Sequence, residues 1–230
     1  MSIDHVVAFV PMRHVSVRVP GKNYRLIAGK PLYAHILDTL LVVPEVSQIV
    51  VDTDSPVILE GLEKHYPMVK AVLRPEHMRA DTVPMNDVLL YDTSLVEADW
   101  YLQTHSTNPL LKAETISRAI RALAEDHPAH DTLFGVTRLQ TRLWDERNRP
   151  INHNPAELIR TQDLPPVFED NSCIYLFQRQ ALIEHGTRLG ARPLMFEIPA
   201  AEAVDIDDEL DFTVAGLMLE AQNQAKKDKA

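Results

Sequence analysis

The stretch VVAFVPMRHVSVRVPGKN, residues 6–23, turns abruptly from an apolar run into a cationic loop. Its first five residues are apolar and rich in valine, a pattern that favours a buried strand of a parallel sheet. Arg13, Arg18 and Lys22 follow, interleaved with small or β-branched residues. Because ligands bind beyond the carboxyl ends of strands in open parallel sheets, the stretch predicts an α/β fold with an anion site after its first strand.

The cationic loop contains a single glycine, Gly21, which is unusual for a loop that holds phosphate. Arginine and lysine side chains can supply the donors and positive charge that a glycine-rich loop supplies through its backbone. The alternative interpretation is a solvated basic loop. Residues 5–37 carry no carboxylate, although the whole chain has a formal net charge of −10, and this segregation favours a small anion as ligand.

The chain then alternates between strand-like and helix-like patterns. Apolar runs with β-branched residues lie at residues 5–10, 48–52, 71–73, 100–103 and 132–136. Helical patterns lie between them, at residues 31–42, 56–65, 85–96 and 113–125. This alternation predicts a mainly parallel sheet covered by helices, and the length suits one domain over residues 1–230.

Residues 140–170 interrupt this alternation. They are rich in proline, asparagine and arginine and show little helical period, so we interpret them as an excursion from the sheet, such as a hairpin arm. A strand at residues 172–177, a short helix at 179–186 and a strand at 193–198 follow. The acidic run AVDIDDELDF, residues 203–212, then leads into a last amphipathic helix.

Composition excludes several classes of protein. The net charge of −10 makes a nucleic-acid partner or an anionic membrane partner improbable on electrostatic grounds. No apolar run is long enough to span a membrane, and residues 1–4 do not resemble a signal peptide. A single cysteine, Cys173, rules out an internal disulfide and is best interpreted as a buried small hydrophobe. We therefore expect a cytoplasmic protein.

The acidic run offers a candidate metal site. Asp205 and Asp207 alternate around Ile206, so an extended backbone would point both carboxylates to one side. Mg²⁺ is typically held by one or two carboxylates together with substrate phosphates. The alternative is an acidic helix N-terminus, which the helix dipole would favour.

Two further polar segments follow predicted strands. QTHSTNPLL, residues 103–111, offers groups able to bind a polyhydroxylated ligand, and His105 is a candidate general base or simply a structural polar residue. Residues 52–54 could contribute to a metal site, but we favour a helix cap at Asp54 or Ser55, directly before Pro56.

Several motifs in this order and spacing resemble the acylneuraminate cytidylyltransferase family, the synthetases of CMP-sialic and related nonulosonic acids. They are Pro11, Arg13, Ser16, Arg18, Pro20, Lys22 and Asn23; AGKPL at 28–32; VVDTD at 50–54; RPE at 74–76 with Asp81 and Asp87; RTQDLPPVFEDNSCIYLF at 160–177; and DIDDELDF at 205–212. The resemblance covers most of the chain. It implies a three-layer α/β/α nucleotidyltransferase fold, with residues 140–170 as a dimerisation arm of a homodimer.

The resemblance also implies a reaction and its residues. The anomeric hydroxyl of a 2-keto-3-deoxy sugar acid would attack the α-phosphate of CTP, with Mg²⁺ as cofactor, and release pyrophosphate. By resemblance the catalytic residues are Arg13, Lys22 and Asp207, and the metal ligands are Asp205 and Asp207. The implied nucleotide-binding residues are Pro11, Arg13, Ser16, Arg18, Lys22, Asn23, Arg74 and Asp81. The implied sugar-binding residues are Gln103, Arg160, Gln162 and Asn171.

The chain departs from the family pattern at residues 14–17, where HVSV replaces the GGSK of many sialic acid enzymes. Relatives that act on 3-deoxy-manno-octulosonate also lack that lysine. Two alternatives to the implied function therefore remain. One is a transferase of another nucleotide to another sugar, and the other is a catalytically weak protein that binds nucleotide sugars.

Overall fold

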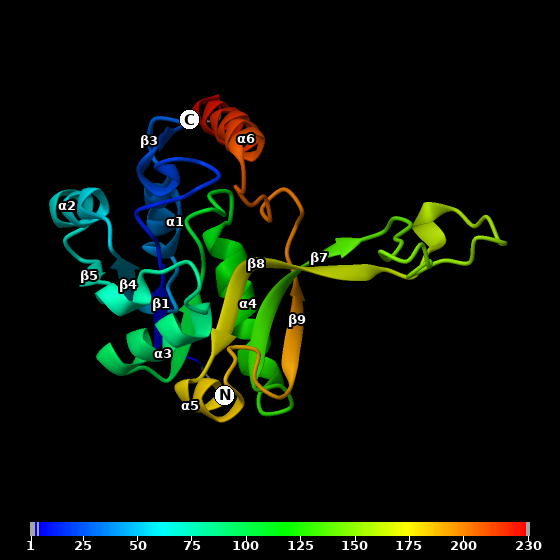
Figure 1. The fold of residues 1–230 in the computed structure, drawn as a ribbon, viewed down its shortest axis with the longest axis horizontal. Coiled ribbons are helices and arrows are strands. Elements are labelled where there is room, and N and C mark those ends of the chain that lie inside the picture. Colours follow the sequence, from blue (N-terminus) through cyan, green and yellow to red (C-terminus); the bar gives the residue numbers. More distant parts are fainter. Residues whose placement is uncertain (1–2, 4, 229–230) are drawn as a thin grey trace.

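The computed structural model describes residue 3 and residues 5–228, and its core is a seven-stranded sheet (Figure 1). In spatial order the strands are β5 (Lys70–Leu73), β4 (Val46–Thr53), β1 (Val6–Phe9), β6 (Trp100–Gln103), β8 (Val167–Phe177), β7 (Thr132–Leu139) and β9 (Pro193–Glu197). The expectations for residues 1, 2, 4 and 229–230 lie outside the described residues.

The sheet is mainly parallel, which confirms the prediction from sequence. β1 pairs in parallel with β4 and β6, β4 with β5, and β7 with β9. Within this sheet only β8 runs against its neighbours among the described strands, pairing antiparallel with both β6 and β7. A separate two-stranded antiparallel sheet is formed by β2 (Leu26–Ile27) and β3 (Lys30–Pro31). From β1 the chain builds outward through β4 and β5, then returns to place β6 on the other side of β1. The loops after β1 and β6 therefore diverge at a topological switch point, where ligands of such sheets bind.

Helices cover both faces of the sheet and make three layers (Figure 1). The larger helices are α1 (Leu32–Leu40), α2 (Pro56–His65), α3 (Met85–Leu95), α4 (Ala113–Asp126), α5 (Arg179–His185) and α6 (Glu209–Lys227). Side chains of β1 alternate between two cores, because successive strand residues point to opposite faces. Val6 and Ala8 pack with residues of α1, α2 and α4, whereas Val7 and Phe9 pack with residues of α3 and α5.

Two helix starts settle alternatives that the sequence left open. Ser55 caps α2, since its hydroxyl accepts a hydrogen bond from the Ile58 amide at 3.4 Å. The Asp54 carboxylate instead accepts a hydrogen bond from the His14 amide at 2.7 Å. At α6, Asp208 is the N-cap and forms a capping box with Asp211. The acidic run thus contains a helix cap, while Asp205 and Asp207 precede the helix.

The strands β7 and β8 continue beyond the sheet as a projecting hairpin (Figure 1). They are longer than the sequence predicted, because their antiparallel pairing runs on to Leu139 opposite Val167. Residues 140–166 lie at the far end of this hairpin, hereafter the arm. Structurally the arm agrees with the expected excursion, and its role in a dimer remains a prediction.

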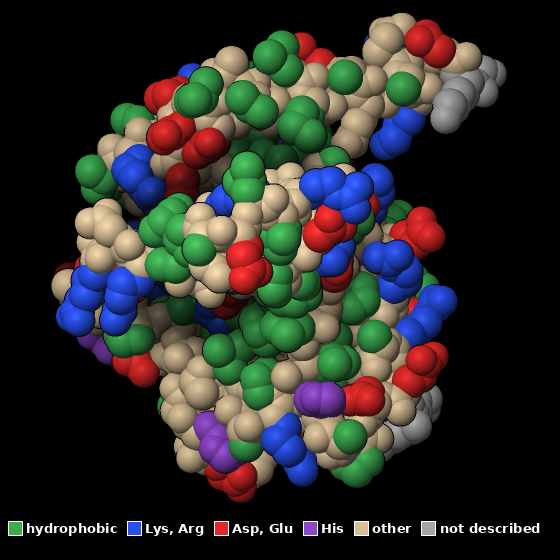
Figure 2. Space-filling view, turned by 90° about the vertical axis from the view of Figure 1, so that its right-hand side faces the viewer, with side chains coloured by type: hydrophobic (Ala, Val, Ile, Leu, Met, Phe, Trp, Pro, Cys, Tyr) green, Lys and Arg blue, Asp and Glu red, His purple; other side chains and the backbone are tan. Residues whose placement is uncertain are grey.

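The described surface carries mixed charges. On the face shown in Figure 2, lysine and arginine side chains are interspersed with acidic ones and form no continuous basic field. Within residues 3 and 5–228, no helix combines the length and the apolarity needed to cross a membrane.

Candidate active site

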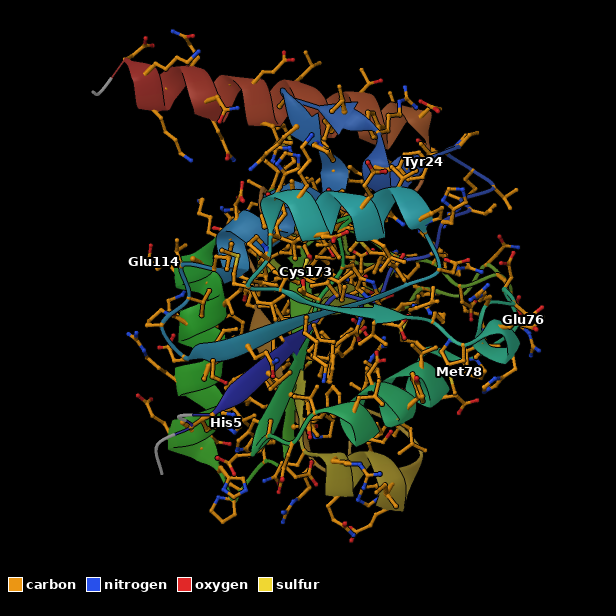
Figure 3. All side chains as sticks on the ribbon, turned by 90° about the vertical axis from the view of Figure 1, so that its left-hand side faces the viewer. His5, Tyr24, Glu76, Met78, Glu114 and Cys173 are labelled. Atoms are coloured by element: carbon orange, nitrogen blue, oxygen red, sulfur yellow. The ribbon has the colours of Figure 1, made fainter. Side chains whose placement is uncertain are left out.

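A pocket of about 470 Å³ lies beyond the carboxyl ends of β1, β5 and β6. In Figure 3, His5 marks the start of β1 on one side of the molecule, whereas Met78 and Tyr24 lie where the strands end. Loops that are distant in sequence line the pocket: Arg13, Arg18 and Lys22 follow β1, Arg74 and Asp81 follow β5, and His105 follows β6. The fold therefore brings the cations of the first loop to the position that the sequence predicted.

The cationic loop is a compact turn. Gly21 has φ 68°, and a Cβ there would lie 2.9 Å from the Tyr24 ring, so this single glycine is required by the backbone. The Lys22 amide donates to the Val19 carbonyl at 3.1 Å, and the Val19 amide donates to the Ser16 hydroxyl at 3.3 Å. Since Val19 is fully buried, the loop is fixed by packing and by its own turns.

Residues 14–17 lie at the pocket mouth, where the chain departs from the sialic acid pattern. The His14 ring stacks on Tyr24 with 5.3 Å between ring centroids, and its Nδ1 is 2.9 Å from the Ser55 hydroxyl. Val15 and Val17 are 65% and 81% exposed. Two apolar side chains thus stand at the entrance, while His14 fastens the loop to the neighbouring α2 cap.

Each cation of the loop has a partner within the chain. Arg13 forms an ion pair with Asp81, and Arg18 Nη2 lies 2.6 Å from the Asp207 carboxylate. The Lys22 ammonium donates to the Ile206 carbonyl at 2.6 Å. Solvent-exposed pairs of this kind are typically worth about 0–1 kcal/mol. A phosphate group can therefore replace these acids at little cost.

The acidic residues that the sequence selected lie beside these cations. Asp205 and Asp207 flank the fully buried Ile206, whose amide donates to the Thr107 carbonyl at 3.0 Å. Desolvation is the main cause that raises the pKa of Asp205, and Asp207 adds to it, while Lys22 opposes both. Desolvation also lowers the pKa of Lys22, against the effect of the two aspartates.

The carboxylates of Asp205 and Asp207 fit a metal ion that takes most of its ligands from water and substrate. Among the described residues no group of three or more His, Cys, Asp or Glu side chains is arranged to hold a metal. Two adjacent carboxylates suit Mg²⁺, which commonly takes one or two carboxylates and completes its shell with water and phosphate oxygens. The Asp207 carboxylate would first have to leave Arg18.

Asn23 joins two walls of the pocket. Its side-chain amide donates to the Arg13 carbonyl at 2.8 Å, and its oxygen accepts a hydrogen bond from the Ser106 hydroxyl at 2.8 Å. Both ends of the amide are thus occupied, and they tie the loop after β1 to the loop after β6. Pro11 is buried in the same wall. Nucleotide contacts by these residues remain predictions.

Arg74 reaches the pocket from a buried ion pair that the sequence did not reveal. Its Nε donates to the Asp52 carboxylate at 2.5 Å, and both side chains are at most 3% exposed. Asp92 of α3 is 1% exposed and lies against Asp52. Burial, followed by the nearby Asp52 carboxylate, raises the pKa of Asp92 to about 9. At neutral pH Asp92 therefore holds a proton that it can donate to Asp52.

The proton accounts for buried oxygens that would otherwise lack partners. Asp52 Oδ2 and both Asp92 oxygens accept no hydrogen bond from an N–H or hydroxyl group in the described structure. A protonated Asp92 carboxyl gives a hydrogen bond to Asp52 Oδ2, which satisfies two of these three oxygens, and leaves one net negative charge to pair with Arg74. From sequence, Asp52 was considered only as part of a possible metal site at residues 52–54, and Asp92 was missed because its partners are distant in sequence.

Gln103, which the resemblance assigns to the sugar, and His105 follow one another at the end of β6 and the start of its loop, and a sugar contact there remains a prediction. The Gln103 amide nitrogen lies 2.7 Å from His105 Nε2, and Gln103 is fully buried. Burial lowers the pKa of His105 to about 4, and the cations Arg188 and Lys22 contribute. The imidazole is thus neutral at pH 7 and a weak base, which favours a structural role over general-base catalysis. Gln103 Oε1 is buried and has no partner in the described residues.

Three other residues predicted to bind sugar do not line the pocket. Asn171 is buried, and its amide is engaged with the Thr137 hydroxyl and the Cys173 amide, both at 3.1 Å. Arg160 pairs with Asp163 on the arm. Arg160 and Gln162 lie on the projecting segment, away from the pocket of their own chain (Figure 1).

Solved structures of two cytidylyltransferases share the fold. The structure is similar to that of CMP:2-keto-3-deoxy-manno-octonic acid synthetase complexed with CTP, with a TM-score of 0.70 and 19% identity over 94% of this chain and 99% of that one. A 4-diphosphocytidyl-2C-methyl-D-erythritol synthase from Anaerococcus prevotii gives a TM-score of 0.67 at 13% identity, with 95% and 97% of the two chains covered. These likenesses confirm the three-layer nucleotidyltransferase fold.

Sequence comparison is more specific. The profile of the family described as cytidylyltransferase matches residues 7–192, so the chain belongs to the cytidylyltransferase family and is an enzyme of the acylneuraminate cytidylyltransferase type. It is 28% identical to CMP-N,N'-diacetyllegionaminic acid synthase of Legionella pneumophila, over 96% of this chain and 98% of that protein. N-acylneuraminate cytidylyltransferase A of Danio rerio is 25% identical over 92% of this chain, which spans 50% of that longer protein.

We predict that Asp92→Asn becomes more stable relative to the wild type as pH rises towards about 9. Because the folded-state pKa of Asp92 is raised, its proton stabilises the fold at low pH, and this contribution is lost as pH rises through that value. Asparagine keeps a donor to Asp52 without titrating. Urea unfolding would measure the free energy of unfolding of both proteins at about pH 5, 7 and 9. The advantage of Asp92→Asn over the wild type should grow by more than about 1 kcal/mol across this range.

Asp87→Asn, at an exposed position of the same helix, is the matched control. Its stability should follow the wild type at each pH. A pH-independent difference between Asp92→Asn and the wild type would show that Asp92 carries no proton in the folded state.

Proposed function

We propose that the protein transfers CMP from CTP to the anomeric hydroxyl of a nonulosonic 2-keto-3-deoxy sugar acid, releases pyrophosphate and uses Mg²⁺. One observation carries this proposal. The cations Arg13, Arg18 and Lys22 line one pocket, and the distant acidic run lies against two of them: Asp207 pairs with Arg18, and the Ile206 carbonyl accepts a hydrogen bond from Lys22. The name of the full-length Legionella relative supports a nonulosonic acid as acceptor.

The pocket suits phosphoryl transfer, which needs positioning and charge neutralisation more than covalent catalysis. The anomeric hydroxyl would lose its proton to solvent as its oxygen forms a bond to the α-phosphorus, and the bond from that phosphorus to the bridging oxygen of pyrophosphate would break. Negative charge then accumulates on the leaving pyrophosphate. Arg13 and Lys22 lie on a packed loop and can stabilise that charge without moving far.

Asp205 and Asp207 are the residues that would hold Mg²⁺, which when bound would neutralise phosphate charge. Before that, Asp207 is occupied by Arg18 at 2.6 Å. A triphosphate that attracts Arg18 would release the Asp207 carboxylate at the same time. Arg18 would thus exchange Asp207 for a phosphate group by a movement of side chains, without a large movement of the backbone.

We further propose that the arm docks on a second copy of the chain. It exposes large apolar side chains, with Leu158 91% exposed, Ile151 55% and Trp144 51%. It also carries Arg160 and Gln162 away from the pocket of its own chain (Figure 1). In a two-fold dimer, these residues of one subunit would complete the sugar pocket of the other.

Two alternatives remain, and each has a distinct signature. A transferase of another nucleotide would release pyrophosphate from a triphosphate other than CTP. A protein that only binds nucleotide sugars would bind CTP without turnover. The geometry favours catalysis, because the acidic run that carries Asp205 and Asp207 lies directly against the cations that line the pocket.

Pyrophosphate release should occur with CTP and not with ATP, GTP or UTP. The assay would combine each triphosphate and Mg²⁺ with a panel of N,N'-diacetyllegionaminic acid, N-acetylneuraminic acid and 3-deoxy-manno-octulosonate. Family membership and the named relatives support CTP as donor. Tight CTP binding with no pyrophosphate from any acceptor would reject the enzymatic proposal in favour of a binding protein.

Asp207→Asn should reduce kcat by more than about 100-fold, as for other losses of transition-state charge stabilisation. The fold should be retained, because the Asp207 side chain is exposed and the α6 capping box uses other carboxylates. Steady-state kinetics would measure kcat, and circular dichroism would test whether the fold is retained. Asp208→Asn, which keeps a good N-cap, should remain active. Equal turnover by Asp207→Asn and the wild type would remove the metal assignment.

The shared pocket predicts complementation between two inactive variants. Arg160→Ala and Asp207→Asn should each be inactive alone. In a mixed dimer, the Arg160→Ala chain keeps Asp207 and receives Arg160 from the other chain, so one pocket is intact. After random exchange of subunits, activity should recover to about a quarter of the wild-type rate for a two-fold dimer. No recovery, although mixed dimers are detected by mass spectrometry, would place Arg160 outside the shared pocket.

A further inference from the structure

A second hollow, of about 160 Å³, adjoins the nucleotide pocket. Met85, at the start of α3, lines both spaces and marks where they meet. The hollow is also lined by Asp170 and Tyr175 of β8 and by Arg188 of the loop after α5. It thus extends the nucleotide pocket towards the antiparallel strand of the sheet.

Arg188 is held flat against an aromatic ring in this hollow. Its guanidinium carbon lies 3.7 Å from the centroid of the Tyr175 ring. Tyr175 is 2% exposed, and its hydroxyl donates to the Asp170 carboxylate at 2.8 Å. Stacking leaves the edge of the guanidinium, which carries its donors, available to a planar anion.

The loop that carries Arg188 is fixed at several points. Asn86 donates to the Gly186 carbonyl at 3.2 Å and accepts a hydrogen bond from the Arg188 amide at 3.4 Å. The Thr132 hydroxyl donates to the Leu189 carbonyl at 2.5 Å. The backbone of residues 186–190 is therefore tied to α3 and to β7, and Arg188 is presented from a constrained loop.

Arg188 has a charge without a counter-ion in this part of the chain. No carboxylate of residues 3 and 5–228 lies within ion-pair distance of it. Asp170 is engaged instead with the Tyr175 hydroxyl and with the Ser172 amide at 3.1 Å. A guanidinium that is stacked and partly buried gains most from a carboxylate supplied by a ligand.

The hollow also adjoins the wall that the sugar acid is proposed to use. Tyr175 of β8 is the direct cross-strand partner of Gln103 in β6. Directly opposed residues of an antiparallel pair project to the same face of the sheet. Gln103 Oε1 is buried there without a donor in the described residues, so this face presents both an unused acceptor and an unused cation.

We propose that Arg188, stacked on Tyr175 beside Gln103, is a specificity residue that binds the carboxylate of the acceptor sugar acid. This inference rests on the proposed function, because it assigns a group of that substrate to a subsite. A hydroxyl of the same sugar would donate to Gln103 Oε1. The acceptor would then be selected as an acid by a residue that the chain supplies from its own C-terminal half.

The test is steady-state kinetics with the sugar acid of the panel that the wild-type enzyme turns over fastest. Arg188→Ala should raise KM for the sugar acid by about 10- to 100-fold, the usual cost of a lost charge-assisted hydrogen bond, and leave KM for CTP unchanged. Arg188→Lys should recover part of the loss. Arg179→Ala, an exposed arginine on α5, is the matched control and should match the wild type.

Arg188→Gln separates a carboxylate from a neutral carbonyl as the bound group. Glutamine keeps a donor but has no charge, so it should behave like alanine if the ligand is a carboxylate. Recovery by glutamine equal to that by lysine would overturn the assignment to the carboxylate. Added guanidinium ions should partly rescue Arg188→Ala, which a purely structural loss would not permit.

The outcomes for the subsite and for the proposed function are distinct. An active wild type, together with an Arg188→Ala variant whose KM for the sugar acid is unchanged, would overturn the subsite alone. If Arg188→Ala loses activity, unfolds at a lower temperature than the wild type and is not rescued by guanidinium, Arg188 has a structural role. A wild type inactive with every acceptor would overturn both proposals.

Discussion

The peptide of Ile206 is the constraint on which the active site depends. Its side chain is fully buried in a cluster with Val19 of the cationic loop and Leu110 of the loop after β6. Its amide donates to the Thr107 carbonyl, and its carbonyl accepts the Lys22 ammonium. Three segments far apart in sequence therefore meet at one residue. Burial of Ile206 also forces its neighbours Asp205 and Asp207 outward, so packing sets the position of the acids.

The ion pairs of the active site are of two kinds, exposed pairs that can exchange partners and one buried pair. Arg13 with Asp81 and Arg18 with Asp207 are solvent-exposed pairs, whose small net stability allows a charged ligand to exchange partners with them. The Arg74 and Asp52 pair differs, because it is buried and supported by a protonated Asp92. Removing one member of a buried pair is costly, so that pair fixes the pocket wall, while the exposed pairs can respond to the ligand.

The loop after β1 shows how a phosphate site can form with one glycine. Gly21 supplies the only left-handed turn of residues 10–23, and buried Val19 and the bridging Asn23 hold the rest of the loop in place. Side chains then provide the donors and the positive charge. Exposed Val15 and Val17 at the mouth leave a less polar entrance than the glycine, serine and lysine of the sialic acid pattern.

The sequence by itself determined the mainly parallel sheet, the cationic loop after β1 and the Asp205 and Asp207 pair. Each of these depends on local information: the period of the apolar residues, the order of strand and loop, and the alternation of side chains along an extended backbone. The family motifs added the enzyme class in the same way, because they are read in chain order.

Only the tertiary structure decided which distant side chains meet. The pairing of Asp52 with Arg74 and Asp92, the stacking of Arg188 on Tyr175 and the neutral state of His105 all depend on burial and on neighbours from other elements. The structure likewise separated Arg160 and Gln162 from the pocket of their own chain (Figure 1). A sequence pattern carries no measure of these distances, whereas desolvation and Coulomb energies depend on them directly.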